Sequence, residues 1–317
     1  MRVVFFCGRS SGHFLRGVIA ELRERRCEVA VCAGEPSPEL DRLLAGADLV
    51  LVEDCISPDV RRQVGEHRMR HGGYRLLFRA SCQASTNDLA GYDGILADRE
   101  AIRDGYVRAG WPRTCWTWHE AADTSLFRPL DRTHFAGDVV WIGDWGDVQP
   151  ISRLFEFILE PASDLNLKVS LYGAQYPEAA RAVLRERGVE CAGPLAEERI
   201  PEILAAFRAT VHIPPQAYPA TRVLEALACG IPVISAPWDD ADRMFTPGSD
   251  YLVAQNGEEM REQLRLVMED ALLCADLSLH GLRTVLSRHT CAHRVDELFS
   301  VYDQLTAAGE FNYALVQ

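Results

Sequence analysis

Apolar and polar residues follow two repeating patterns along the chain. Short apolar runs such as residues 2–7 predict buried strands, and stretches with apolar residues three or four apart, such as 58–70, predict amphipathic helices. In the first half the predicted strands are 2–7, 28–34, 48–52, 75–78, 92–98 and 114–120. Helices ending near 26, 44, 70 and 109 separate them, so the pattern predicts an α/β fold with a parallel sheet.

The same alternation begins again at DVVWIGDWGD, residues 138–147, after a linker with little periodicity. Further strands are predicted in LKVSLYG, VECAG, TVHIPP and DYLVAQ, with helices between them, and the chain is predicted to be helical from 257 onward. We therefore expect two Rossmann-like, doubly wound domains. Their predicted limits are residues 1–122 and 123–290, with a C-terminal helix in 291–317 that packs back toward the first domain.

The stretch TRVLEALACGIPVISAPW, residues 221–238, combines a helix, its stop signal and a buried strand. Gly230 suits a C-terminal cap, and Pro232 prevents the helix from continuing. Ligands of doubly wound sheets bind where strands end and helices begin. The polar residues at the start of this helix are therefore candidates for a binding site: Thr221 as a cap, Arg222 in the first turn, and Glu225 one turn later.

Composition narrows the class of protein. At 317 residues and 48% hydrophobic, the chain is long enough for two cores. It has no apolar run of about 18 residues, and its first residues read as a strand rather than a signal peptide, which favours a soluble cytoplasmic protein without a transmembrane segment. The ten cysteines occur singly, without a CxxC pair, as expected for reduced thiols.

The net charge of −13 is unevenly distributed. Residues 1–120 contain 17 basic and 17 acidic side chains of the totals of 33 and 46, which leaves 16 and 29 for the remainder. This balance argues against general nucleic-acid binding and against a strongly anionic membrane as a partner.

Several stretches resemble the GT-B glycosyltransferases, and most of all their CgeB-like, spore-maturation-type group. They are WTWHEAADTSLFRP, VVWIGDWGD, LYGAQYP, residues 221–238 with the two aspartates that follow, PGSDYLVA and RHTCAHRVDEL. Together they span most of residues 114–298, whereas 14–113 resemble the family only in fold. GRSSGH, at 8–13, is also similar to the GGTGGH loop of the peptidoglycan lipid-linked N-acetylglucosaminyltransferase.

The resemblance implies a transferase that moves a sugar from a UDP-, GDP- or TDP-linked donor, bound by the C-terminal domain, to an acceptor on the N-terminal domain across a closing cleft. The nucleotide sugar is a substrate, and no cofactor or metal is expected. Glu225 matches the second glutamate of the family's E-x7-E pattern, which implies ribose binding. Ala217 stands where the first glutamate would be, which puts the retaining mechanism associated with the pattern in doubt.

Diphosphate binding needs positive charge or free amide groups. Arg222, at a helix N-terminus, supplies a cation, although an ion pair with Glu225 is its structural alternative. The loop with Gly143, Trp145 and Gly146 is a second candidate, with Arg153 in the next helix, unless it is an ordinary turn. The remaining donor-side candidates end strands at the same edge and would shape the nucleoside pocket: Gly173, Gly193 and Pro214.

His13 is the candidate general base, because it follows Gly12 at the end of the first loop and imidazole titrates near neutral pH. A bond to the helix N-terminus is its structural alternative. Gly12 itself is a candidate for acceptor binding. The other candidates on the acceptor side follow later strands of the first domain: His119 and Glu120 as catalytic residues, and Arg79 and Ser81 in acceptor binding. Two histidines in HTCAH, 289–293, do not converge with the cysteine between them, so no metal site is predicted there.

Two other functions remain open from the sequence. A GT-B-fold epimerase or hydrolase would convert the nucleotide sugar without an acceptor, and a non-catalytic member would act in assembly. Neither the donor base, the sugar, the acceptor, the stereochemistry nor the oligomeric state follows from the residues.

Overall fold

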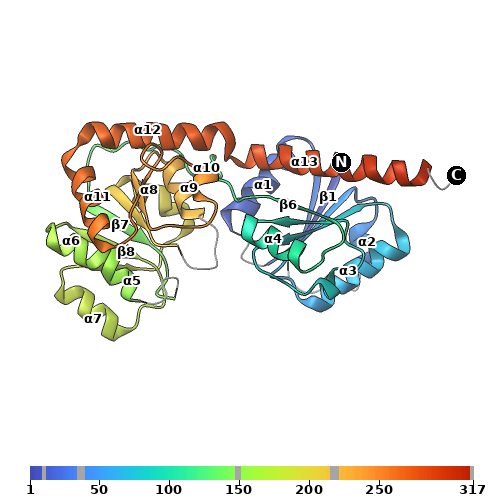
Figure 1. Ribbon diagram of the computed structural model, residues 1–317, viewed down its shortest axis with the longest axis horizontal. Coiled ribbons are helices and arrows are strands. Elements are labelled where there is room, and N and C mark those ends of the chain that lie inside the picture. Colours follow the sequence, from blue (N-terminus) through green and yellow to red (C-terminus); the bar gives the residue numbers. More distant parts are fainter. Residues whose placement is uncertain (9–11, 34–39, 147–150, 215–220, 315–317) are drawn as a thin grey trace. The chain divides into compact units, whose positions relative to one another are not determined.

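The computed structural model describes residues 1–8, 12–33, 40–146, 151–214 and 221–314 (Figure 1). The chain divides into two compact units: unit 1 comprises Met1–Glu120 and Cys291–Gln317, and unit 2 comprises Ala121–Thr290. Each unit contains a six-stranded, entirely parallel sheet with flanking helices. The predicted α/β fold with two Rossmann-like halves is confirmed.

The sheet of unit 1 has the strand order β2-β1-β3-β4-β5-β6. Its strands are β1 Arg2–Cys7, β2 Glu28–Ala33, β3 Leu49–Glu53, β4 Arg75–Ala80, β5 Gly94–Ala97 and β6 Thr114–Thr117. The central strand β3 is buried at every residue, as continuous apolar runs between two helical layers should be. The helices are α1 His13–Glu24, α2 Leu40–Leu44, α3 Pro58–His71, η1 Thr86–Leu89, α4 Glu100–Arg108 and α13 Cys291–Ala314.

The last helix, α13, packs on α1 within unit 1. Trp118, only 1% exposed, lies beneath it and donates its indole N–H to the Arg294 carbonyl at 3.0 Å. The same ring meets Phe14 of α1 edge to face, with centroids 5.1 Å apart. A buried indole with a satisfied N–H thus attaches the C-terminal helix to the first sheet.

The sheet of unit 2 has the order β12-β11-β10-β7-β8-β9. Its strands are β7 Gly137–Ile142, β8 Val169–Tyr172, β9 Glu190–Gly193, β10 Phe207–His212, β11 Val233–Ser235 and β12 Leu252–Val253. The helical segments are α5 Ser152–Leu154, η2 Phe155–Leu159, α6 Glu160–Asp164, α7 Glu178–Glu186, η3 Glu197–Arg199, α8 Ile200–Ala205, α9 Thr221–Ala228, α10 Ala241–Met244, α11 Gly257–Glu269 and α12 Ala271–Arg288. In the part of the chain that the structure describes, no helix combines the length and apolar character needed to cross a bilayer.

Glycine at position 65 allows α3 to approach the loop after η1. A Cβ at Gly65 would overlap the Ala90 carbonyl oxygen, and Gly91 beyond it has φ +87°, a conformation that favours glycine. The Tyr92 hydroxyl donates to the Arg61 carbonyl of α3 at 3.1 Å across the same contact. Backbone packs directly on backbone here, so neither α3 nor the loop after η1 can move without a large cost in free energy.

Replacement of Gly65 by Ala should lower the stability of unit 1 by about 2 kcal/mol or more, because backbone strain outweighs the gain of about 1 kcal/mol in helix propensity. Gly105→Ala in α4 is the matched control. Its Cβ would meet only the flexible end of the Gln83 side chain, so it should cost little. Urea unfolding of both variants measures the difference, and equal stabilities would contradict the close approach.

Candidate functional site: the carboxyl edges of the two sheets

In unit 2 the candidate residues gather where β7, β8 and β10 end. These strands are adjacent in the order β10-β7-β8, so the loops after Ile142, Tyr172 and His212 share one edge of the sheet. This is the edge at which doubly wound folds bind ligands.

Helix α9 begins at Thr221 and carries Arg222 and Glu225. Glu225 is 1% exposed, and its Oε2 accepts a hydrogen bond from Arg222 Nη1 at 2.6 Å. The Arg222 side chain is 40% exposed. A guanidinium has several N–H donors in one plane, so a single bond to Glu225 leaves donors directed elsewhere. The ion pair considered as an alternative to ligand binding is therefore present, and it joins a buried carboxylate to an accessible cation.

His212, the last residue of β10, is a further member of this group that the sequence did not reveal. The Ser235 hydroxyl donates to the Ala236 carbonyl at 2.7 Å, so it accepts from His212 Nδ1–H at 3.1 Å. Burial lowers the His212 pKa to about 3, and the nearby Arg222 contributes to the shift. The ring is therefore neutral, with its Nε2 as an acceptor. In the sequence this histidine is one residue of an apolar strand, with no spacing that marks it.

Arg153, in α5, reaches the same edge. Its Nη1 donates to the carbonyl of Pro214, just beyond β10, at 3.1 Å, and its guanidinium lies 5.6 Å from the centre of the Phe157 ring. Its charge also lowers the pKa of His212, after burial and Arg222. Two guanidinium groups thus flank the end of β10. A pocket at this point is lined by side chains that include Thr210, His212, Arg222 and Glu225.

The glycine loop after β7 is bonded to its neighbours. The N–H groups of Gly143 and Trp145 donate to the carbonyls of Tyr172 and Ala174, at 2.8 and 3.1 Å. The Trp145 ring packs against Tyr176, with centroids 5.3 Å apart. These two amide groups therefore bond the loop after β7 to the end of β8 and to the loop that follows β8. Around Gly146 an added Cβ would meet no atom within 4 Å.

Gly173 is required by this loop packing, since a Cβ there would overlap the Gly143 carbonyl oxygen. Its N–H donates to the Gly193 carbonyl at 2.9 Å, which brings the ends of β7, β8 and β9 together. Ala217 lies outside the described residues, and so do Arg9, Ser10 and Ser11 of the first glycine loop.

In unit 1 the carboxyl edge carries a buried ion-pair network. Arg79, at the end of β4, is 8% exposed and donates to Glu53 at 2.8 Å and to Glu120 at 2.9 Å. Its guanidinium also lies 4.9 Å from the centre of the Phe14 ring. Burial alone would lower the Arg79 pKa, but Glu120 and Glu53 outweigh it and the pKa is raised. Arg79 therefore joins three elements of the unit.

Two aspartates complete this edge. Asp54 Oδ2 accepts from the N–H and the hydroxyl of Ser81, at 2.7 and 2.6 Å, which fixes the turn after β4. Asp98 follows β5, is 1% exposed, and accepts from Arg99 Nε at 3.2 Å. Burial raises the Asp98 pKa to about 6, although Arg99 and Arg79 oppose the shift. Neither aspartate was predicted as a site residue from the sequence, although each directly follows a strand.

His13 is the first residue of α1, after Gly12, and is 6% exposed. Its Nδ1 lies 3.2 Å from Arg16 Nη2. Arginine can only donate, so Nδ1 is the acceptor, and the neutral ring carries its proton on Nε2. His119 is half-buried near Glu297 of α13; burial raises the pKa of that carboxyl, and His119 is among the charges that oppose the rise. His289 of HTCAH contacts the Met244 carbonyl at 2.9 Å.

The site of unit 2 lies in a segment that is similar to a known protein family. Residues 150–300 match the glycosyl transferase-like family. The matched segment, just under half of the chain, contains Arg153, His212, Arg222 and Glu225. Among curated proteins, no sequence matches the chain.

Solved structures with the same fold cover nearly the whole chain. HepE from Anabaena, in complex with UDP, superposes with a TM-score of 0.71 at 14% identity, over 96% of this chain and 100% of that one. The sucrose-phosphate synthase of Thermosynechococcus elongatus gives 0.72 at 15% identity, over 97% and 100%. AviGT4, a glycosyltransferase of avilamycin A biosynthesis, gives 0.67 at 14% identity, over 97% and 98%. The fold is therefore that of the GT-B glycosyltransferases.

The raised pKa of Asp98 predicts a pH-dependent stability. Between pH 3.8 and about 6 the folded protein binds more protons at this carboxyl than the unfolded chain does, so its contribution to stability falls as pH rises. Relative to Asp98→Asn, the wild type should lose on the order of 2–3 kcal/mol of unfolding free energy between pH 4 and pH 7.

Denaturant unfolding across this range measures the effect. Asp276→Asn, on the exposed face of α12, is the control. Its unfolding free energy should change with pH as that of the wild type does. If the unfolding free energy of Asp98→Asn has the same pH dependence as that of the wild type, burial does not destabilise the charged Asp98 carboxylate.

Proposed function

We propose that this protein is a nucleotide-sugar-dependent glycosyltransferase that binds its donor at the carboxyl edge of the unit 2 sheet. The observation that carries the proposal is the group formed by Glu225, Arg222 and His212 inside the segment that matches the glycosyl transferase-like family. The group provides a buried carboxylate, an accessible guanidinium and a neutral imidazole at the edge where such folds bind nucleotides.

Each member suits one part of a nucleoside diphosphate. A carboxylate accepts hydrogen bonds from the two ribose hydroxyls, and burial strengthens those bonds by excluding water. Arg222 lies at the start of α9, where the helix dipole adds to its positive charge, so the diphosphate would be stabilised there. HepE has been solved with UDP and with UDP-glucose, which favours a uridine nucleotide among the UDP, GDP and TDP donors.

In the reaction, an acceptor hydroxyl attacks the anomeric carbon, the bond from that carbon to the diphosphate oxygen breaks, and the nucleoside diphosphate leaves with the electron pair. The hydroxyl proton must pass to a base. We propose His13 for this role, on the carboxyl edge of unit 1, with no metal ion in the catalytic step. Because Nδ1 already accepts from Arg16, proton uptake there requires that hydrogen bond to open.

Binding of UDP tests the donor site. Saturating UDP should raise the melting temperature of the wild type, and Glu225→Gln or Arg222→Gln should weaken UDP binding by roughly 10–100-fold, as expected for loss of a charged hydrogen bond. The matched control is Arg199→Gln, because Arg199 makes the same i,i+3 pair with Glu202 at 3.3 Å on an exposed surface of unit 2. Calorimetric titration with UDP, GDP and TDP measures all four proteins.

The proposal fails if none of the three nucleotides binds, or if Glu225→Gln binds UDP as the wild type does. Product analysis with UDP-glucose alone distinguishes a glycosyltransferase from an epimerase, because formation of a sugar epimer identifies an epimerase. Binding without any turnover, across a panel of nucleotide sugars and acceptors, identifies a non-catalytic protein.

Two substitutions of His13 separate a base from a hydrogen-bond donor. If the imidazole takes the proton, both His13→Gln and His13→Asn should slow UDP release from UDP-glucose by about 100-fold or more, with UDP affinity unchanged. If His13 only donates from Nε2, glutamine can replace that N–H and His13→Gln should retain activity while His13→Asn loses it. Steady-state rates of UDP release give the result, and an active His13→Gln variant excludes the role as base.

A further inference from the structure

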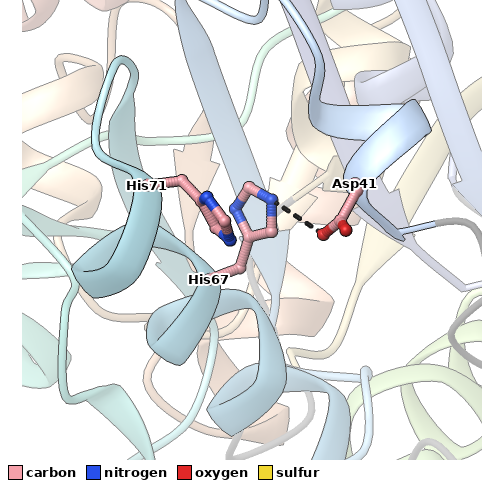
Figure 2. Close-up of side chains that lie close together, drawn as sticks. All are labelled: Asp41, His67 and His71. Atoms are coloured by element: carbon pink, nitrogen blue, oxygen red, sulfur yellow. Dashed lines mark ion pairs between the residues drawn. The ribbon is translucent and has the colours of Figure 1, made fainter.

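Two histidines and an aspartate meet at the other edge of the unit 1 sheet, away from the residues discussed above. His67 and His71 lie four residues apart on α3, hence on the same helical face, and Asp41 projects toward them from α2 (Figure 2). Nitrogen and oxygen atoms of the three side chains lie within 4.8 Å of one another. Among the described residues this is the one such group of three metal-ligating side chains.

The geometry is that of a partly open ligand set. His67 Nε2 lies 3.3 Å from Asp41 Oδ1, and the two imidazole centres are 4.6 Å apart. His67 is 7% exposed, whereas Asp41 and His71 are exposed and can adjust their rotamers around a bound ion. The group lines a pocket of about 350 Å³ that also includes Gly46, Gly72 and Tyr74.

The buried histidine is oriented from behind by Tyr74. Gly72 and Gly73, with φ of +65° and +87°, turn the chain from the end of α3 toward β4, which returns Tyr74 to the face of His67. His67 Nδ1 lies 3.0 Å from the Tyr74 hydroxyl, which is 3.4 Å from the Val64 carbonyl. When Nε2 binds a metal ion, the ring proton lies on Nδ1 and is donated to the Tyr74 hydroxyl, which in turn donates to the Val64 carbonyl.

Metal–ligand bonds of about 2.0–2.1 Å at a tetrahedral angle place two adjacent ligand atoms roughly 3.3 Å apart. His67 Nε2 and Asp41 Oδ1 have this separation, at 3.3 Å. A second-shell hydrogen bond to the far nitrogen of a ligating histidine is usual in metal sites.

We propose that His67 Nε2, an imidazole nitrogen of His71 and a carboxylate oxygen of Asp41 bind one divalent transition-metal ion of the zinc class. Two imidazoles and one carboxylate suit Zn²⁺ and leave a coordination position for water. The ion ties α2 to the C-terminal end of α3. The site lies at the amino ends of β3 and β4, opposite the edge that holds Arg79 and His13, so it is independent of the proposed sugar transfer.

Zinc titration of chelator-treated protein tests this site. The ten cysteines can also bind zinc, so the measured quantity is the difference between proteins. Wild type and His134→Ala, a control at an exposed histidine of unit 2, should bind one more Zn²⁺ than His71→Ala and Asp41→Asn. Tyr74→Phe should retain the site with roughly 10–100-fold lower affinity, because it removes only the second-shell partner. Equal stoichiometry and affinity in wild type, His71→Ala and Asp41→Asn would overturn the proposal.

Cobalt substitution gives an independent readout of the ligands. Co²⁺ bound to wild type should show visible absorption of a nitrogen- and oxygen-ligated ion that His71→Ala lacks. A spectrum dominated by sulfur-to-cobalt charge transfer, unchanged in His71→Ala, would place the metal on cysteines and exclude this site. UDP binding by unit 2 should be the same with and without zinc.

Discussion

The ion pair between Arg222 and Glu225 connects the fold of unit 2 to its chemistry. A carboxylate that is 1% exposed is costly unless a counter-charge and hydrogen bonds accompany it, and Arg222 supplies both at 2.6 Å. The parallel sheet makes this possible, since it aligns the ends of β7, β8 and β10 and leaves the start of α9 beside them. The pair keeps a carboxylate in a buried position while its cation stays accessible.

Unit 1 meets the same constraint with a larger network. Arg79 lies between Glu53 and Glu120, and Asp98 and Arg99 lie nearby, so the carboxyl edge carries alternating buried charges. Because its guanidinium is bonded to both Glu53 and Glu120, Arg79 supports this edge. Burial disfavours the charged form of Asp98. Ionisable groups with shifted pKa values cluster at functional sites, and structural ion-pair networks shift pKa values as well.

The two edges of this sheet differ in chemistry because they differ in what surrounds them. At the carboxyl edge loops run into helix N-termini, and arginine and carboxylate side chains pair there. At the amino edge the ends of α2 and α3 place exposed imidazole and carboxylate groups around the buried His67 (Figure 2). The imidazole and carboxylate groups of the amino edge suit a borderline cation such as Zn²⁺, whereas the charged groups of the carboxyl edge are paired with one another.

The sequence by itself determined the strands, the helices, the parallel sheets and the position of Arg222 and Glu225 on one helix, because these depend on local periodicity and on the fixed geometry of a helical turn. It did not separate a phosphate-binding loop from a structural turn at Gly143, since that depends on where Tyr172 and Ala174 place their carbonyls. Nor did it identify His212, Asp98 or the group of Asp41, His67 and His71. Those assignments depend on burial and on contacts between elements distant in the chain, which only the tertiary structure decided.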